Sequence, residues 1–90
     1  MNNQDKLEKI IAHYGHEEQL WQCVEELTEC SLALMHHAKD KYSNHHEEIA
    51  DALIMLEQMR LIYGPRNIDA LIEMKLDRTM QRIEDASSGS

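Results

Sequence analysis

Apolar side chains recur at helical spacing from the start of the chain. Residues 4–14 carry them at positions i, i+3, i+4 and i+7, the pattern of an amphipathic helix: Leu7, Ile10, Ile11 and Tyr14. Asn2 or Asn3 stands before this segment as a helix cap, and Gly15 follows it as a stop. The first predicted element is therefore a helix of about three turns.

A second and longer helix is predicted over residues 16–39. Its apolar residues form a single stripe: Leu20, Val24, Leu27, Leu34 and Ala38. Residues 40–44 then interrupt the apolar period. Asn44 and Glu47 have the spacing of a capping box, so a third helix is expected to begin near His45. Gly64 and Pro65 should end it after Tyr63.

The third predicted helix is apolar in nearly every direction around its axis. Eleven apolar residues crowd into 49–63: Ile49, Ala50, Ala52, Leu53, Ile54, Met55, Leu56, Met59, Leu61, Ile62 and Tyr63. A helix that is apolar on all sides must be buried on all sides. Three neighbouring helices can hardly surround it, so we expect a second subunit to complete the cover, with an interface at Leu53, Leu56 or their neighbours.

A fourth helix is predicted over residues 68–84, after Asn67. It is expected to bury one apolar face: Ile68, Leu71, Ile72, Leu76 and Ile83. Residues 86–90 have the composition of a disordered tail. The prediction is one all-α domain over residues 1–85, a four-helix bundle completed by oligomerisation as a homodimer or homotetramer.

Composition and charge exclude several classes of protein and of binding partner. The chain has 90 residues, 42% of them hydrophobic and 29% charged, which is typical of a globular domain. Its net charge of −8 is the wrong sign for binding a nucleic acid polymer. No apolar run approaches a membrane span, and the N-terminal residues do not resemble a secretory signal, so a cytoplasmic location is expected. Cys23 and Cys30 are seven residues apart on one helix, too far for a disulfide.

Acidic residues form pairs at i, i+3 on the two central helices. Glu26 and Glu29 are one such pair, and Glu48 and Asp51 are the other. Like charges at this spacing repel each other, so the arrangement costs stability unless a cation lies between them. The second pair continues an angular strip that is apolar further along the helix, which indicates that these carboxylates point inward.

Two helices joined by a short connection pack antiparallel, which could bring the four carboxylates together. Grouped oxygen ligands suit a hard cation such as Mg²⁺ or Mn²⁺ better than Zn²⁺. The alternative is an ordinary solvated face, since the chain has 17 acidic residues. The six histidines are interpreted as surface residues beside loops, although His46 could approach the mouth of the site.

The order of these motifs resembles that of the MazG-like all-α nucleoside triphosphate pyrophosphohydrolases. The family pattern Glu-Glu-x-x-Glu, a spacer and Glu-x-x-Asp reads here as 25–29 and 48–51. The resemblance extends over about residues 16–84 and includes a Lys-x-x-Arg at Lys75 and Arg78. It implies a MazG-like bundle that cleaves a nucleoside triphosphate between the α and β phosphates, giving a monophosphate and pyrophosphate.

The resemblance also assigns roles to single residues. It implies that Glu26, Glu29, Glu48 and Asp51 are ligands of Mg²⁺, or of Mn²⁺. Glu25 and Glu26 would be the catalytic residues, with Glu25 either supporting the metal ligands from outside or acting as the base that orients the attacking water. Lys75 and Arg78 would bind the outer phosphates of the substrate. The rival interpretation is a non-catalytic helical interaction or nucleotide-binding module. The sequence names neither the base nor the sugar of the substrate.

Overall fold

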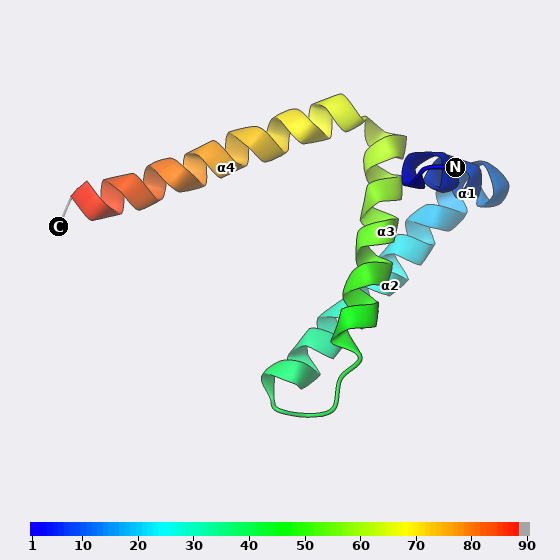
Figure 1. Cartoon of the computed structure of the whole chain (residues 1–90), viewed down its shortest axis with the longest axis horizontal. Coiled ribbons are helices and arrows are strands. Elements are labelled where there is room, and N and C mark those ends of the chain that lie inside the picture. Colours follow the sequence, from blue (N-terminus) through cyan, green and yellow to red (C-terminus); the bar gives the residue numbers. More distant parts are fainter. Residues whose placement is uncertain (89–90) are drawn as a thin grey trace.

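The computed structural model describes residues 1–88, which form four helices and contain no strand. The helices are α1 (Asn3–Tyr14), α2 (His16–Ala38), α3 (His45–Tyr63) and α4 (Pro65–Ser88). Figure 1 shows α2 and α3 side by side, α1 across one end of this pair, and α4 running away from it. The all-α prediction is confirmed. Within the described chain, however, the four helices do not close into a bundle.

Local signals placed the first helix boundaries correctly. The Asn2 side chain accepts a hydrogen bond from the backbone N–H of Asp5, at 2.8 Å, so Asn2 is the N-cap of α1. Gly15 ends α1 with a φ of +91°, a conformation that side-chain-bearing residues rarely adopt. Asn44 precedes α3 as predicted. Its side chain makes no capping bond and instead donates to a carboxylate oxygen of Glu48.

The core lies between α2 and α3 and is small. Its buried members within residues 1–88 are four apolar side chains and two glutamines: Cys23, Ala33, Ala52, Met55, Gln19 and Gln58. Gln19 Nε2 donates a hydrogen bond of 2.6 Å to Gln58 Oε1, so each buried amide has a partner. At the other end of the pair, the Ser43 hydroxyl donates to the carbonyl of Ala33, at 2.6 Å. The first contact joins the two antiparallel helices directly, and the second holds the connection before α3 against α2.

The junction of α3 and α4 forms an elbow. Gly64 takes a φ of +116°, and Pro65 begins α4. The Arg60 guanidinium spans the elbow, with its Nε donating to Asp69 Oδ1 at 2.7 Å and its Nη2 bonded to the other oxygen. This bidentate pair lowers the pKa of Asp69 and raises that of Arg60. It braces the angle at which α4 leaves the rest of the chain.

The fourth helix departs from the prediction in three ways. It begins at Pro65, because proline is well suited to the first helical position, and not after Asn67. It also continues through Ser88, so residues 86–88 are helical; 89–90 lie outside the described residues. Finally, no residue of α4 is buried, and of its predicted core face only Ile68 is half-buried while the others are exposed. The sequence showed that this face is apolar, but a helix that contacts only α3 near the elbow has nothing to bury it against.

The expected cover of α3 is likewise incomplete within one chain. Leu53, Ile54 and Leu56 are exposed, although the apolar pattern of this helix predicts burial on every side. Trp21 on α2 is exposed too. Both cysteines are free, as predicted from their spacing. No helix among residues 1–88 has the length and hydropathy that crossing a membrane requires.

Candidate metal centre

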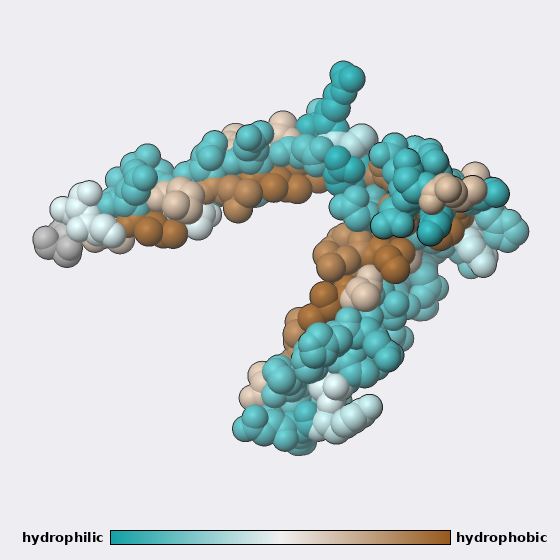
Figure 2. All heavy atoms as spheres, viewed as in Figure 1, coloured by the Kyte–Doolittle hydropathy of each residue, from teal (hydrophilic) through white to brown (hydrophobic). Residues whose placement is uncertain are grey.

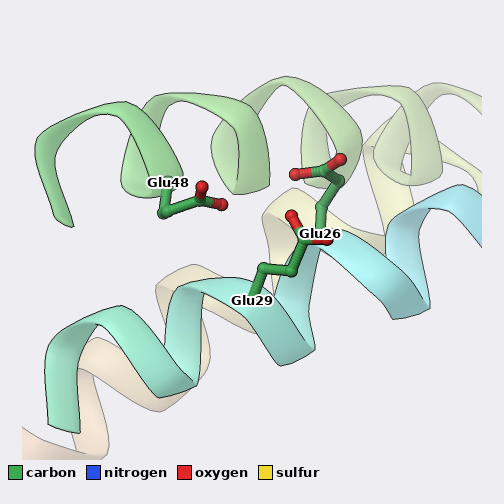
Figure 3. A group of neighbouring side chains, drawn as sticks. All are labelled: Glu26, Glu29 and Glu48. Carbon is green, nitrogen blue, oxygen red and sulfur yellow. The ribbon is translucent and has the colours of Figure 1, made fainter. Parts of the chain in front are cut away.

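Three carboxylates converge between α2 and α3. Glu26 and Glu29 come from adjacent turns of α2, and Glu48 comes from the first turns of α3 (Figure 3). Each offers an oxygen, and the three oxygens lie within 4.8 Å of one another. We call these three residues the Glu triad. Three carboxylate oxygens at this spacing could hold a metal ion such as Mg²⁺.

The antiparallel register of α2 and α3 accounts for this convergence. The buried hydrogen bond sets Gln19 opposite Gln58. Ten residues forward along α2 is Glu29, and ten residues back along α3 is Glu48, so these two are set at the same level. By the same count, Glu26 is level with Asp51. The two acidic motifs thus meet because both helices carry them at equal distances from one buried polar pair.

Two oxygen atoms of the triad are buried without a hydrogen-bond partner in the described chain, Glu26 Oε2 and Glu48 Oε2. Their sister oxygens are occupied: Gln22 Nε2 donates to Glu26 Oε1, and Asn44 Nδ2 donates to Glu48 Oε1, both at 2.9 Å. These amides orient the two carboxylates and leave one oxygen of each free. A buried carboxylate oxygen without a donor is costly, and a bound cation would satisfy it. The donor set therefore fits a hard divalent cation.

Glu29 is the exposed member of the Glu triad, and the neighbouring carboxylates act on its charge. Its pKa is raised, chiefly by the negative charges of Glu26 and then Glu48, with smaller contributions from desolvation and from the charges of Glu25 and Asp51. Every charge that raises this pKa is a carboxylate. A cation placed among them would reverse the effect and favour the ionised form.

The structure brings together three of the four predicted ligands. Asp51 is not among the converging oxygens, although its charge reaches Glu29. Glu25 also acts on Glu29 through its charge and is not a member of the triad. Lys75 and Arg78 lie on α4, which among the described helices contacts α3 and neither α1 nor α2. One chain therefore does not place these two cations beside the triad.

Histidines at the α2–α3 connection form a cluster that sequence reasoning missed. The rings of His37 and His45 stack with their centroids 4.0 Å apart, and His46 lies 4.4 Å from His45. His45 is half-buried, so the expectation of surface histidines is wrong for this residue. Its pKa is lowered, first by desolvation and then by the other two rings. Proximity of residues 37 and 45 depends on the path of the connecting loop, which no local pattern specifies.

Sequence reasoning also missed the two amide side chains that orient the Glu triad, although the spacing that predicts them is visible in the sequence. Gln22 stands four residues before Glu26, and Asn44 stands four residues before Glu48. Side chains at i, i+4 are neighbours on a helix surface. An amide four residues before each inward carboxylate was therefore a readable sign that these carboxylates are held in place.

Comparison with known proteins finds no matching family model, no similar curated protein and no similar solved structure. Residues 1–88 form a small all-α structure of four helices with the Glu triad between α2 and α3.

Proposed function

We propose that this chain is a Mg²⁺-dependent nucleoside triphosphate pyrophosphohydrolase that cleaves a (d)NTP between the α and β phosphates. The convergence of Glu26, Glu29 and Glu48 within 4.8 Å carries the proposal. These residues belong to the two acidic motifs whose order resembles the MazG-like family. Ordinary solvated acids would have no reason to leave two buried oxygens without partners at one point.

The chain's own residues would divide the work as follows. Glu26, Glu29 and Glu48 would hold the metal, with Asp51 as a fourth carboxylate at the edge of the site. When bound, Mg²⁺ neutralises phosphate charge and increases the acidity of water. Glu25, next to Glu26 in the chain, would orient the attacking water and accept its proton. Gln22 and Asn44 would keep the carboxylates aimed inward.

A substrate with four negative charges also needs donors for its outer phosphates. Lys75 and Arg78 are one turn apart on α4 and match the Lys-x-x-Arg of the resembling family. Because α4 does not reach α2 within one chain, we propose that these two residues act on a substrate held by another copy.

Pyrophosphate release from a panel of canonical and damaged (d)NTPs, with Mg²⁺, Mn²⁺ or EDTA, tests the proposed activity. We expect a monophosphate and pyrophosphate from at least one nucleotide, and no turnover in EDTA. Release of orthophosphate alone, or no product from any nucleotide, would rule out the proposed reaction.

A thermal-shift series with the same metals tests the metal centre separately. At a concentration about 100-fold above Kd, Mg²⁺ should stabilise the chain by about 2.7 kcal/mol. For a domain of this size that is roughly 10–20 °C in Tm. Stabilisation by metal without hydrolysis of any nucleotide would support the non-catalytic binding module, and no stabilisation would remove the metal centre itself.

A further inference from the structure

The fourth helix carries an apolar stripe that, beyond the elbow, is exposed within the described chain. Its exposed members are spaced along 71–83: Leu71, Ile72, Leu76, Met80 and Ile83. With half-buried Ile68 at its start, the stripe covers 16 residues, with a rise of about 22 Å from the first to the last. An isolated helix gains little from its own hydrogen bonds and depends on packing of such a face. Something therefore has to cover α4.

A second exposed apolar surface lies on the α2–α3 pair. On α2 it follows Leu20, Val24, Leu27 and Leu34, and on α3 it includes Leu53 and Leu56. Figure 2 shows apolar surface along both inner sides of the angle between α4 and this pair. The stripe on α2 covers 15 residues, with a rise of about 21 Å from the first to the last, which matches the length of the stripe on α4. The two unpartnered surfaces thus agree in length and open toward the same space.

The chain exposes far more surface than a folded monomer of its mass. Its solvent-accessible surface is 7212 Å², whereas a compact protein of 10.5 kDa exposes about 5,400 Å². The excess of about 1,800 Å² is within the range that one subunit of an obligate dimer buries, about 1,000–2,500 Å². The radius of gyration is 16.9 Å, against about 12 Å for a compact chain of 90 residues.

We propose that a second copy of this chain covers both surfaces, with α4 of each copy lying on the α2–α3 surface of the other. A two-fold axis makes this contact twice, so one kind of interface covers every unpartnered stripe. Charge favours the same pairing: residues 1–64 contain 12 acidic and five basic residues, a net −7, whereas 65–88 contain five and four, a net −1. A nearly neutral helix can approach a strongly acidic pair with little repulsion.

The elbow argues against α4 folding back onto its own chain. Closing the angle would disturb the bidentate contact of Arg60 with Asp69 and the backbone of Gly64. The brace instead holds α4 extended, where a second copy can reach it. This inference concerns assembly and does not depend on the metal centre or on the proposed activity.

The mass of the full chain in solution is the first test. Light scattering coupled to size exclusion, from about 1 to 100 µM, should give the mass of two chains or of a whole number of such pairs. A well-folded monomer at the highest concentration, whether extended or closed on itself, would overturn the proposal.

Paired substitutions then test which surfaces meet. Leu76→Asp places a charge in the stripe of α4, and Met74→Asp places the same charge about 160° away on that helix. Leu27→Asp and Leu32→Asp form the equivalent pair on α2, about 140° apart. All four residues are exposed within one chain. We expect Leu76→Asp and Leu27→Asp to weaken the dimer at least tenfold in Kd, and the two controls to change it less than threefold.

Each outcome of this comparison decides a part of the proposal. Equal effects of Leu76→Asp and Met74→Asp would mean that the stripe on α4 is not part of the interface, which overturns the proposal. An effect of Leu76→Asp without one of Leu27→Asp would mean that α4 pairs with α4 of the other copy, which also overturns the reciprocal arrangement. Circular dichroism checks the helix content of every variant. Should an aspartate variant lose its helices, the milder Leu76→Ala and Leu27→Ala are compared by dilution.

Discussion

Helices α2 and α4 both carry a single apolar stripe, yet within the described chain α2 packs against α3 and α4 packs against nothing beyond the elbow. The α2–α3 pair contains all the buried residues of the described chain, whereas α4 contains none. Helices α2 and α3 pack antiparallel against each other, share a buried glutamine contact and are joined by a short connection. Helix α4 is held only at the elbow, by the contact of Arg60 with Asp69. An apolar stripe therefore indicates that a helix packs against another surface. The topology decides whether that surface belongs to the same chain.

The largest expected effect is a loss of turnover when a carboxylate of the Glu triad is replaced, compared with replacement of an acidic residue elsewhere. Replacing Glu29 or Glu48 by glutamine keeps the size of the side chain and removes the charge that holds the metal, so turnover should fall about 100-fold or more. Steady-state pyrophosphate release measures this loss. Glu84→Gln, an exposed change on α4, is the matched control and should leave turnover unchanged.

The same series decides the roles of the remaining acids. Glu26→Gln should act like the other triad variants, whereas Asp51→Asn shows whether the fourth carboxylate joins the metal. Near-normal turnover in both Glu48→Gln and Asp51→Asn would mean that the site lies on other residues.

A second prediction compares a buried amide with an exposed one. Gln58→Leu leaves the Gln19 amide buried without its partner, which should cost about 1–3 kcal/mol of unfolding free energy. Gln81→Leu removes an exposed amide contact with Asp85 on α4 and should change stability by about 0.5 kcal/mol or less. Urea denaturation measures both.

Because the glutamine contact sets the register of α2 and α3, Gln58→Leu should also weaken stabilisation by Mg²⁺. Equal stabilities for the two glutamine variants, with metal binding intact in both, would contradict its role in register.

The third prediction tests whether α4 takes part in the chemistry. Lys75→Ala and Arg78→Ala remove donors for the outer phosphates, so each should lower kcat/KM about tenfold, or 1.4 kcal/mol. Stabilisation by Mg²⁺ in the absence of nucleotide should stay unchanged, because neither residue belongs to the triad. Unaltered kinetics in both variants would assign phosphate binding to other residues.

The smallest effect is a pH dependence of the metal-free protein. The raised pKa of Glu29 means that the folded chain binds more protons than the unfolded chain just above the ordinary value of 4.5. Stability should therefore be greatest on the acid side of this window and fall as the pH rises through it. Denaturant titrations at several pH values in EDTA measure the slope.

Glu29→Gln should remove this part of the slope, and Glu84→Gln should keep it. Saturating Mg²⁺ should reverse the sign, since a bound cation favours the ionised carboxylate. A slope that is the same in the wild type and in Glu29→Gln would show that the triad carries no net repulsion.

Local sequence patterns predicted much of the candidate site. What they could not predict has a physical explanation. The i, i+3 spacing identified the acidic pairs on both helices, and the structure brings three of the four together. In the structure Asp51 is not one of the converging residues. Helical spacing predicts in which direction a side chain leaves its own helix, but not how far that helix lies from its neighbour. The stacking of His37 on His45 was missed for a related reason, since a loop brings these rings together.

The sequence by itself determined four helices, the turns at Gly15 and Gly64, the acidic motifs and the apolar stripes, because caps, breakers and periodicity act within a few residues. Only the tertiary structure decided that the Gln19–Gln58 contact aligns the triad and that α4 leaves the pair at a braced elbow. Those outcomes depend on how whole helices pack, and packing is settled by contacts between residues far apart in the chain.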